Sequence, residues 1–219
     1  SSDVTGVGTN RRDCGACGYG EDKGIFGFGW TGSYTGVTNL VSNTGVVATD
    51  VSAVGTARRG VAACEYGGDK GIFGYGYSTS AVSISNLVSN SGVVATDTSG
   101  VGTARSGPGA CEYSADKDKG IFRGGYSGSP QNVSNLVSNA GVVASDTSGV
   151  GSARGSLAAL NYGVDKAIFG FGSTGSYTAV SNLVSNAGVV ATDTTGVGSA
   201  RNELAGCEYG GDKAIFGYG

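Results

Sequence analysis

Histidine, the side chain that most often serves as a general base and as a metal ligand, is absent from the 219 residues. Its absence excludes Ser-His-Asp and Cys-His catalysis, and it leaves a zinc site dependent on cysteines alone. Cys14 and Cys17 form a CxxC pair, but no second pair follows, so the metal or redox signal is weak. We therefore expect no metal, no cofactor and no enzymatic activity.

Arginine and aspartate recur at fixed intervals instead of gathering in one asymmetric cluster. We predict that the aspartates cap turns by accepting hydrogen bonds from backbone N–H groups, with calcium binding and acid–base catalysis as alternatives. We predict that the arginines pair with carboxylates or backbone carbonyls, the alternative being an anion or glycan site. The arginines are Arg11, Arg58, Arg105, Arg154 and Arg201, and the aspartates are Asp50, Asp97, Asp146, Asp193, Asp22, Asp69, Asp118, Asp165 and Asp212.

Aromatic side chains that could bind a ligand gather in segments that vary between otherwise similar stretches of sequence. These segments are 30–38, 77–85, 126–134 and 173–181, and their candidate binding residues are Trp30, Tyr34, Tyr77, Tyr126 and Tyr177. Tyr, Ser, Thr and Gly provide both stacking surfaces and adaptable hydrogen bonds. The residues after each recurring arginine also vary, for example Asp13 and Glu203. Binding surfaces and neutral drift in unconstrained loops are both compatible with this variation.

Composition limits the elements that can position these residues. There are 43 glycines without a Gly-X-Y period, which excludes collagen, and glycine at this frequency disfavours helices. Apolar residues occur in short clusters of Val, Ala, Ile, Phe and Tyr, as is typical of strands. No apolar run approaches the roughly 18 residues of a membrane helix. The net charge of −3, without a basic cluster, predicts that neither nucleic acid nor a membrane is a partner.

A unit of 47 residues repeats along the chain. The motif Asp-Lys-(Gly/Ala)-Ile-Phe occurs five times at spacings of 47, 49, 47 and 47, and the longer spacing contains a duplicated Asp-Lys at 116–119. The motif Asn-Leu-Val-Ser-Asn-x-Gly-Val-Val-Ala-(Thr/Ser)-Asp occurs four times. We treat residues 1–219 as one repeat domain, with units at approximately 4–50, 51–97, 98–146, 147–193 and 194–219.

Each unit contains four strand candidates, separated by glycine-containing turns. In the second unit these candidates are 61–66, 70–75, 86–89 and 93–96. Four short strands per 40 to 50 residues is the size of one β-propeller blade. One strand position holds Cys17, Cys64, Cys111, Leu160 and Cys207, which indicates a small core residue rather than a disulfide framework. A recurring tyrosine is expected to pack between blades; it is Tyr19, Tyr66, Tyr113, Tyr162 and Tyr209.

The repeat resembles the kelch repeat. The resemblance lies in the arginine after Gly-Val-Gly-Thr-Ala, a run of small residues, a hairpin, and an apolar strand that ends in glycines. It departs from kelch because Gly-Phe-Gly or Gly-Tyr-Gly replaces the Gly-Gly doublet and no unit carries the kelch tryptophan. The chain also resembles highly repetitive propeller arrays of viral and environmental microbial origin, with Asp-Lys-Ala-Ile-Phe-Gly-Tyr-Gly blades. Both resemblances imply a β-propeller, and neither implies an activity.

The number of blades follows from counting strands. The chain supplies four complete units, two further strands at 204–218, and a stub, Ser1 to Asp3, that matches the end of a fourth strand. We expect an all-β propeller of about five four-stranded blades with the last blade incomplete. The alternatives are four blades with an extra hairpin and a fragment of a longer array.

These expectations lead to two hypotheses about function. The first is a non-enzymatic binding scaffold, lectin-like and multivalent, whose repeated loops bind a glycan or a protein. The second is a structural or assembly protein of a virion or surface fibre that associates with itself through an open sheet edge. Both favour an extracellular or virion-surface location.

Overall fold

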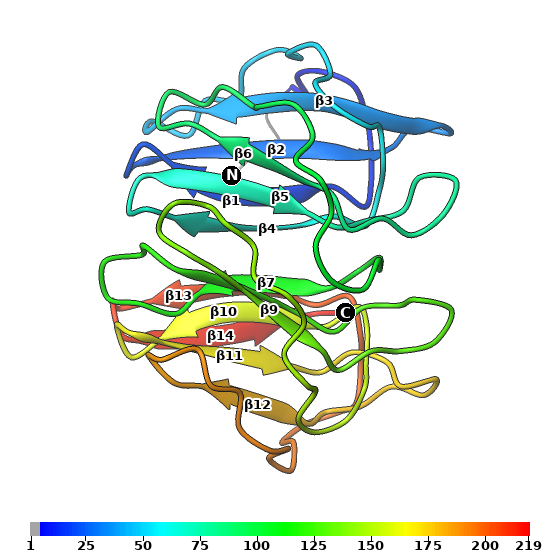
Figure 1. Cartoon of the computed structure of the whole chain (residues 1–219). Coiled ribbons are helices and arrows are strands. Elements are labelled where there is room, and N and C mark those ends of the chain that lie inside the picture. Colours follow the sequence, from blue (N-terminus) through cyan, green and yellow to red (C-terminus); the bar gives the residue numbers. More distant parts are fainter. Residues whose placement is uncertain (1–4) are drawn as a thin grey trace.

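The computed structural model describes residues 5–219, so the predicted stub Ser1 to Asp3 lies outside the described part of the chain. Residues 5–219 form fourteen strands in five small antiparallel sheets (Figure 1), which confirms the all-β prediction. No helix that could span a membrane occurs among these residues. The strands are β1 (Gly15–Tyr19), β2 (Lys23–Trp30), β3 (Tyr34–Val41), β4 (Ala62–Tyr66), β5 (Lys70–Gly74), β6 (Ser85–Val88), β7 (Gly109–Glu112), β8 (Gly120–Arg123), β9 (Ser134–Val137), β10 (Ala158–Tyr162), β11 (Lys166–Gly170), β12 (Ser181–Val184), β13 (Ala205–Tyr209) and β14 (Lys213–Gly217).

Each unit begins with a hairpin whose turn contains residues with a positive φ. In the second unit, Gly67 and Gly68 have φ angles of 62° and 79°, which only glycine adopts without steric cost. The hairpin pairs Cys64 with Ile72, and β6 then pairs with the other edge of β5. The same order of three strands occurs in the first four units, whereas the fifth sheet consists of β13 and β14.

The prediction of a fourth strand in each complete unit is wrong. After the hairpin turn that follows β6, the backbone forms only isolated bridges, such as Val88 with Val94 and Ser85 with Thr98. A side chain replaces part of the missing ladder, because Nδ2 of Asn86 donates to the carbonyl of Ala95 at 3.0 Å. A complete unit is therefore a three-stranded sheet followed by an irregular segment.

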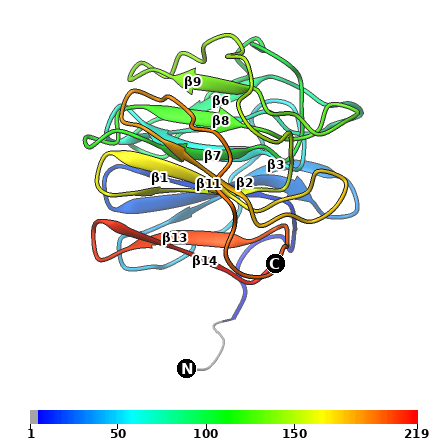
Figure 2. The same cartoon turned by 90° about the horizontal axis from the view of Figure 1, so that it is seen from below.

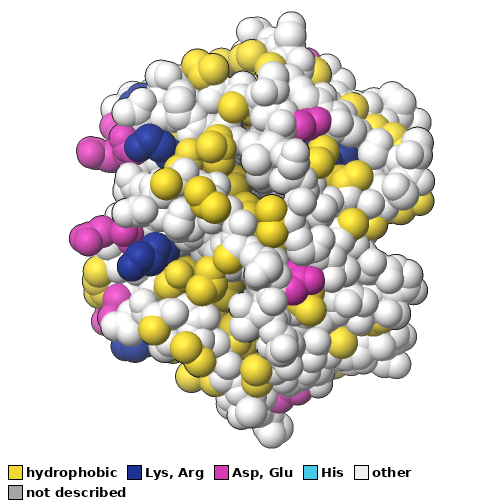
Figure 3. All heavy atoms as spheres, in the orientation of Figure 1, with side chains coloured by type: hydrophobic (Ala, Val, Ile, Leu, Met, Phe, Trp, Pro, Cys, Tyr) yellow, Lys and Arg dark blue, Asp and Glu magenta, His cyan; other side chains and the backbone are white. Residues whose placement is uncertain are grey.

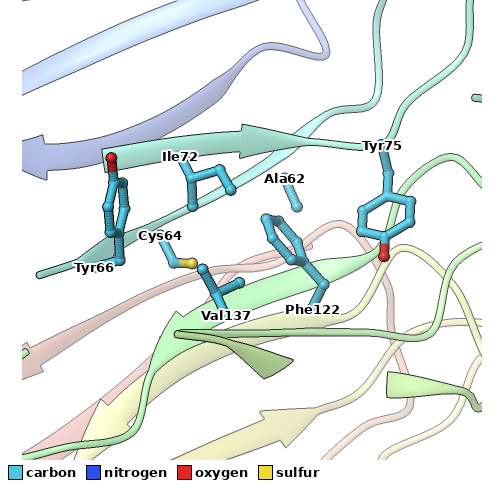
Figure 4. Close-up of a cluster of buried hydrophobic side chains, with 7 residues drawn as sticks. All are labelled: Ala62, Cys64, Tyr66, Ile72, Tyr75, Phe122 and Val137. Atoms are coloured by element: carbon cyan, nitrogen blue, oxygen red, sulfur yellow. The ribbon is translucent and has the colours of Figure 1, made fainter. Parts of the chain in front are cut away.

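The hydrophobic core lies between successive sheets. Ile72 and Tyr75 of the second sheet face Phe122 and Val137 of the third, and all four side chains are at most 1% exposed (Figure 4). Tyr75 and Phe122 meet edge to face at 5.2 Å between ring centroids. Equivalent clusters join the first sheet to the second and the third to the fourth.

The first strands of the five units surround a common axis. Each of β1, β4, β7, β10 and β13 lies beside the next one in this order. Their central residues, contributed by all five units, line one narrow channel of about 380 Å³. The recurring cysteine position lies on these strands, where Cys64 and Cys111 are buried. All five cysteines are free thiols.

The stack of sheets is open between the last unit and the first. Tyr19, Tyr66 and Tyr113 are each 4% exposed, whereas the equivalent Tyr209 is 53% exposed. At the other end of the stack, Phe26 of the first sheet is 41% exposed, although the equivalent Phe122 of the third sheet is fully buried. The face of the fifth sheet and the facing side of the first sheet therefore remain largely uncovered.

Candidate functional site

A depression of about 680 Å³ lies at one end of the axis, and residues of all five units line it. Each unit contributes a turn immediately before its first strand. The turn residues are Asp13, Gly60, Gly107, Ser156 and Glu203, and their φ angles lie between 50° and 60°. Among these turns, a relay of backbone hydrogen bonds runs from unit to unit: Gly60 N–H to Asp13 O, Gly107 N–H to Gly60 O, Ser156 N–H to Gly107 O, and Glu203 N–H to Ser156 O, at 2.8 to 3.0 Å.

Three of these five turns carry side chains where the backbone favours glycine. A positive φ costs a non-glycine residue of order 1 kcal/mol, and such strain is often found at functional sites. The scaffold accepts glycine here, since Gly60 and Gly107 adopt the same conformation. Asp13, Ser156 and Glu203 therefore place polar groups around the depression at a conformational cost.

Aromatic side chains form one wall of the depression. Tyr77 and Tyr126 line it directly, at the same position of successive units. Tyr34 packs against Tyr77 at 6.2 Å between ring centroids, and Trp30 packs edge to face against Tyr34 at 4.8 Å. Trp30 and Tyr34 are cross-strand partners at the end of the β2–β3 hairpin, which explains their contact.

Arg59 connects the aromatic wall to the polar turns. Its guanidinium lies 5.0 Å from the ring centroid of Trp30, and its Nη1 lies 3.6 Å from Oδ2 of Asp13. The side chain also lines the depression. The site thus combines a cation, the carboxylates of Asp13 and Glu203, and the rings of two tyrosines, of which Tyr77 is 36% exposed and Tyr126 is half-buried. This set can donate to and accept from hydroxyl groups while stacking against an apolar ring face.

The structure brings together some of the predicted ligand-binding residues and separates others. Tyr77 and Tyr126 lie in the depression, and Trp30 and Tyr34 form the layer behind Tyr77. Tyr177 is 64% exposed and is not among the lining residues.

The recurring arginines do not belong to the site. Arg58, Arg105 and Arg154 are fully buried, which corrects their inclusion among the candidate ligand-binding residues. Arg58 donates to Oδ1 of Asn86 at 2.7 Å and lies 4.0 Å from the centroid of Phe28. Burial lowers the pKa of Arg58 to about 10, and Asp97 opposes this shift. Arg58 also donates to the backbone carbonyls of Tyr75 and Thr56, as expected from the prediction that the arginines pair with carboxylates or backbone carbonyls.

Arg11 and Arg201 occupy the same repeat position in the first and last units. The Arg11 side chain is 7% exposed and donates to Oδ1 of Asn39 at 2.5 Å. Arg201 is partly buried, and its guanidinium lies 5.0 Å from the centroid of Phe171. Neither residue lines the depression at the end of the axis.

The recurring aspartates bind backbone N–H groups, but these groups are distant in sequence. Asp97 accepts from the backbone N–H and from Oγ1 of Thr56, 41 residues earlier, and from Nδ2 of Asn86. Hydrogen bonds from Thr9 and Asn39 likewise lower the pKa of Asp50. Asp50, Asp97, Asp146 and Asp193 therefore join the two ends of a unit instead of capping a local turn. The aspartates of the Asp-Lys motif differ: Asp69, for example, accepts from the side chains of Lys70 and Asn90. Acidic and basic side chains lie next to one another along one edge of the face shown in Figure 3.

Carboxylates gather in the axial channel lined by the first strands. Glu65, Glu112 and Glu208 occupy the same position of three units, and Lys117 lies 3.6 Å from Glu208. Lys117 belongs to the duplicated Asp-Lys that lengthens the third unit. Burial, and then the charge of Glu65, raise the pKa of Glu112 to about 7. Within residues 5–219, no three His, Cys, Asp or Glu side chains are arranged to hold a metal ion.

Several lining residues were not among the predicted site residues, although the sequence contained a signal for them. Asp13 and Glu203 belong to the second variable segment, which directly follows the recurring arginines. Ser106, Pro108 and Leu157 line the depression as well. All of these residues lie between the recurring arginine of a unit and the first strand of that unit. This shared position predicts a common site only when the first strands of the five units are known to lie side by side.

Neither a known protein-family model nor a curated protein matches the sequence.

Proposed function

We propose that the chain is a non-enzymatic β-propeller of five blades, the fifth incomplete, and that it binds a glycan in the depression at the end of its axis. One observation carries this proposal. The residues between each recurring arginine and the following first strand differ between units, and in all five units they line that depression, whereas the positions that repeat are used mainly for packing and for hydrogen bonds between and within units.

The propeller interpretation rests on the radial arrangement of the sheets. Five first strands surround one channel, and each sheet packs face to face against the next. Propellers characteristically repeat one small sheet around a central channel. The hairpin β13–β14 packs on the fourth sheet through Phe216, whose ring lies 5.4 Å from that of Phe171. This contact favours a fifth blade over a detached extra hairpin.

The glycan interpretation rests on the chemistry of the lining. Tyr77 and Tyr126 contribute aromatic rings to the lining, and Asp13, Arg59 and Glu203 contribute charged acceptors and donors. Sugars present both apolar C–H faces and hydroxyl groups, so they match this mixture. All five units contribute to this single depression, and the proposed ligand stoichiometry is therefore one per chain instead of several equivalent sites.

A screen of immobilised oligosaccharides, followed by calorimetric titration of each soluble hit, tests the proposal. We expect saturable binding with a stoichiometry close to one. Four or five equivalent sites would indicate binding to the repeated loops instead, and the absence of any oligosaccharide ligand would reject the glycan.

A further inference from the structure

The fifth sheet presents a strand edge that is covered in every other unit. In the complete units, the second strand pairs with the first strand on one side and with the third on the other. In the part of the chain that the structure describes, β14 pairs with β13 alone, and this two-stranded sheet lies at one side of the molecule (Figure 2). The free edge of β14 therefore exposes backbone groups that are paired in β5, β8 and β11.

The fifth unit also lacks the polar partners that the third strand supplies elsewhere. Arg154 donates to Oδ1 of Asn182 at 2.5 Å, and Ser152 donates to Asp193. The equivalent residues of the fifth unit are Arg201 and Ser199. Residues 5–219 provide neither of them with a corresponding asparagine or aspartate.

An apolar groove of about 420 Å³ lies on the fourth unit, with Tyr162, Leu183, Val189 and Ala191 among its lining residues. At the equivalent place on the third unit, Gly188 fits so closely that a Cβ would lie 2.8 Å from Leu136 and 3.1 Å from the ring of Tyr113. The first and second units are covered in the same way, by Gly92 and Gly141 respectively. The groove is therefore the place where the turn after a further third strand would pack.

We propose that the free edge of β14, the pair Ser199 and Arg201, and the groove on the fourth unit form one acceptor site for an extended polypeptide segment. The segment is of the repeat's own third-strand type, Ser-Asn-Leu-Val-Ser-Asn-x-Gly-Val-Val-Ala-Thr-Asp. The occupant is a segment with this sequence that lies outside residues 5–219. The site thus recognises a defined sequence and not merely a strand.

The complete units define the register of the bound segment. In the fourth unit, Phe169 pairs with Asn182 and Ile168 with Leu183. By the same register, Phe216 pairs with the first asparagine of the segment and Ile215 with its leucine. The asparagine side chain then accepts from Arg201, as its equivalents accept from Arg58, Arg105 and Arg154.

Three further parts of the segment also have partners in the acceptor site. The closing aspartate accepts from Ser199, the second asparagine reaches Asp212, and the glycine turn fills the groove against Tyr162 and Leu183. In the first, second and fourth units, the second asparagine donates to the aspartate of Asp-Lys at 2.9 Å. A generic strand would pair with the edge of β14 but would satisfy neither Arg201 nor the groove.

A synthetic peptide with the sequence of residues 181–193 tests the proposal. Fluorescence anisotropy of the labelled peptide should show saturable one-to-one binding to the full chain, and hydrogen exchange of the Lys213–Gly217 amides should slow. The peptide carrying Asn182→Ala and the protein carrying Arg201→Ala should each bind about tenfold more weakly or worse. Combining the two changes should add little further loss, because both remove one hydrogen bond. Arg59→Ala, in the axial depression, is the matched control and should leave peptide affinity unchanged.

Three results would overturn the proposal. One is equal binding of a scrambled peptide, and another is losses from Asn182→Ala and Arg201→Ala that simply add. The third is the absence of binding, with no slowing of exchange in β14. The Asn182→Ala peptide is measured against the unaltered protein, so the test holds even if the Arg201→Ala protein folds poorly.

Discussion

The guanidinium of Arg58 donates a hydrogen bond of 2.7 Å to Oδ1 of Asn86, 28 residues further along the chain, and both side chains are fully buried. The same pair recurs as Arg105 with Asn135 and as Arg154 with Asn182. The asparagine simultaneously donates to the aspartate that closes the unit. This buried pair therefore joins the start of each complete unit to its third strand and its end.

Removing the asparagine should be costly because it leaves a buried cation without its acceptor. We expect Asn86→Ala to lower the free energy of unfolding by about 3 kcal/mol. Asn90→Ala is the matched control, since exposed Asn90 bonds only to Asp69 at the surface and should cost less than about 1 kcal/mol. Guanidinium chloride unfolding measures both variants. Equal losses would contradict the structural role of the buried pair.

Phe→Ala substitutions at two repeat-equivalent positions test whether the outer side of the first sheet is uncovered in solution. Phe122 is fully buried and Phe26 is 41% exposed. Phe122→Ala should therefore destabilise the fold by about 3 to 5 kcal/mol, and Phe26→Ala by roughly 1 to 2 kcal/mol. Thermal and denaturant unfolding compare the two variants. A loss at Phe26 as large as that at Phe122 would show that another surface covers the first sheet in solution.

The proposed glycan site predicts that the tyrosines of the variable loops contribute unequally to the affinity for the glycan. Tyr77→Ala should weaken binding of the oligosaccharide identified by the screen about tenfold or more, because the ring lines the depression. Arg59→Ala should have a similar effect. Tyr177→Ala is the control, since Tyr177 is exposed outside the depression. Calorimetric titration distinguishes the cases, and equal losses at Tyr77 and Tyr177 would place the ligand on the repeated loops.

The carboxylates in the axial channel predict a dependence of stability on pH. The pKa of Glu112 is raised from 4.5 to about 7 in the fold, so the folded state binds its proton more tightly than the unfolded state. This carboxyl therefore imposes no penalty below about pH 4.5, and its destabilising effect grows as the pH rises through 7. Relative to Glu112→Gln, the unaltered protein should lose up to about 3 kcal/mol between pH 5 and 8.

Unfolding at a series of pH values tests this dependence. The difference in free energy of unfolding between the unaltered protein and Glu112→Gln, taken at each pH, isolates the contribution of this carboxyl. A constant difference between the unaltered protein and Glu112→Gln across the range would contradict the raised pKa.

Much of the local structure could be predicted from the repeat. The hairpin at Gly67 and Gly68 follows from turn glycines between apolar runs, and the first three strand candidates of the unit are formed at nearly the expected residues. The fourth candidate was wrong because its apolar pattern resembles that of a strand, while the side chain of Asn86 takes over part of its backbone pairing. Such competition by a side chain from a distant position is not visible in local periodicity.

The candidate site was predictable only in part. Tyr77 and Tyr126 stood out because they are aromatic residues in variable loops, but the same reasoning also selected Tyr177, which lies elsewhere. The recurring arginines were predicted to pair within the scaffold, with ligand binding as the alternative, and Arg58 is buried against Phe28 and Asn86. Local sequence cannot distinguish an exposed cation from a buried one whose partner lies 28 residues away.

The sequence by itself determined the all-β class, the unit of 47 residues and the hairpin register, because turn glycines and alternating side chains act between near neighbours. Only the tertiary structure decided which of the repeated residues are covered. Tyr66 and Tyr209 follow the same Cys-Glu sequence, yet one is 4% and the other 53% exposed. The difference arises because burial depends on a neighbouring sheet about 47 residues away, which Tyr66 has and Tyr209 lacks. The same long-range packing brings the variable turns together into one depression.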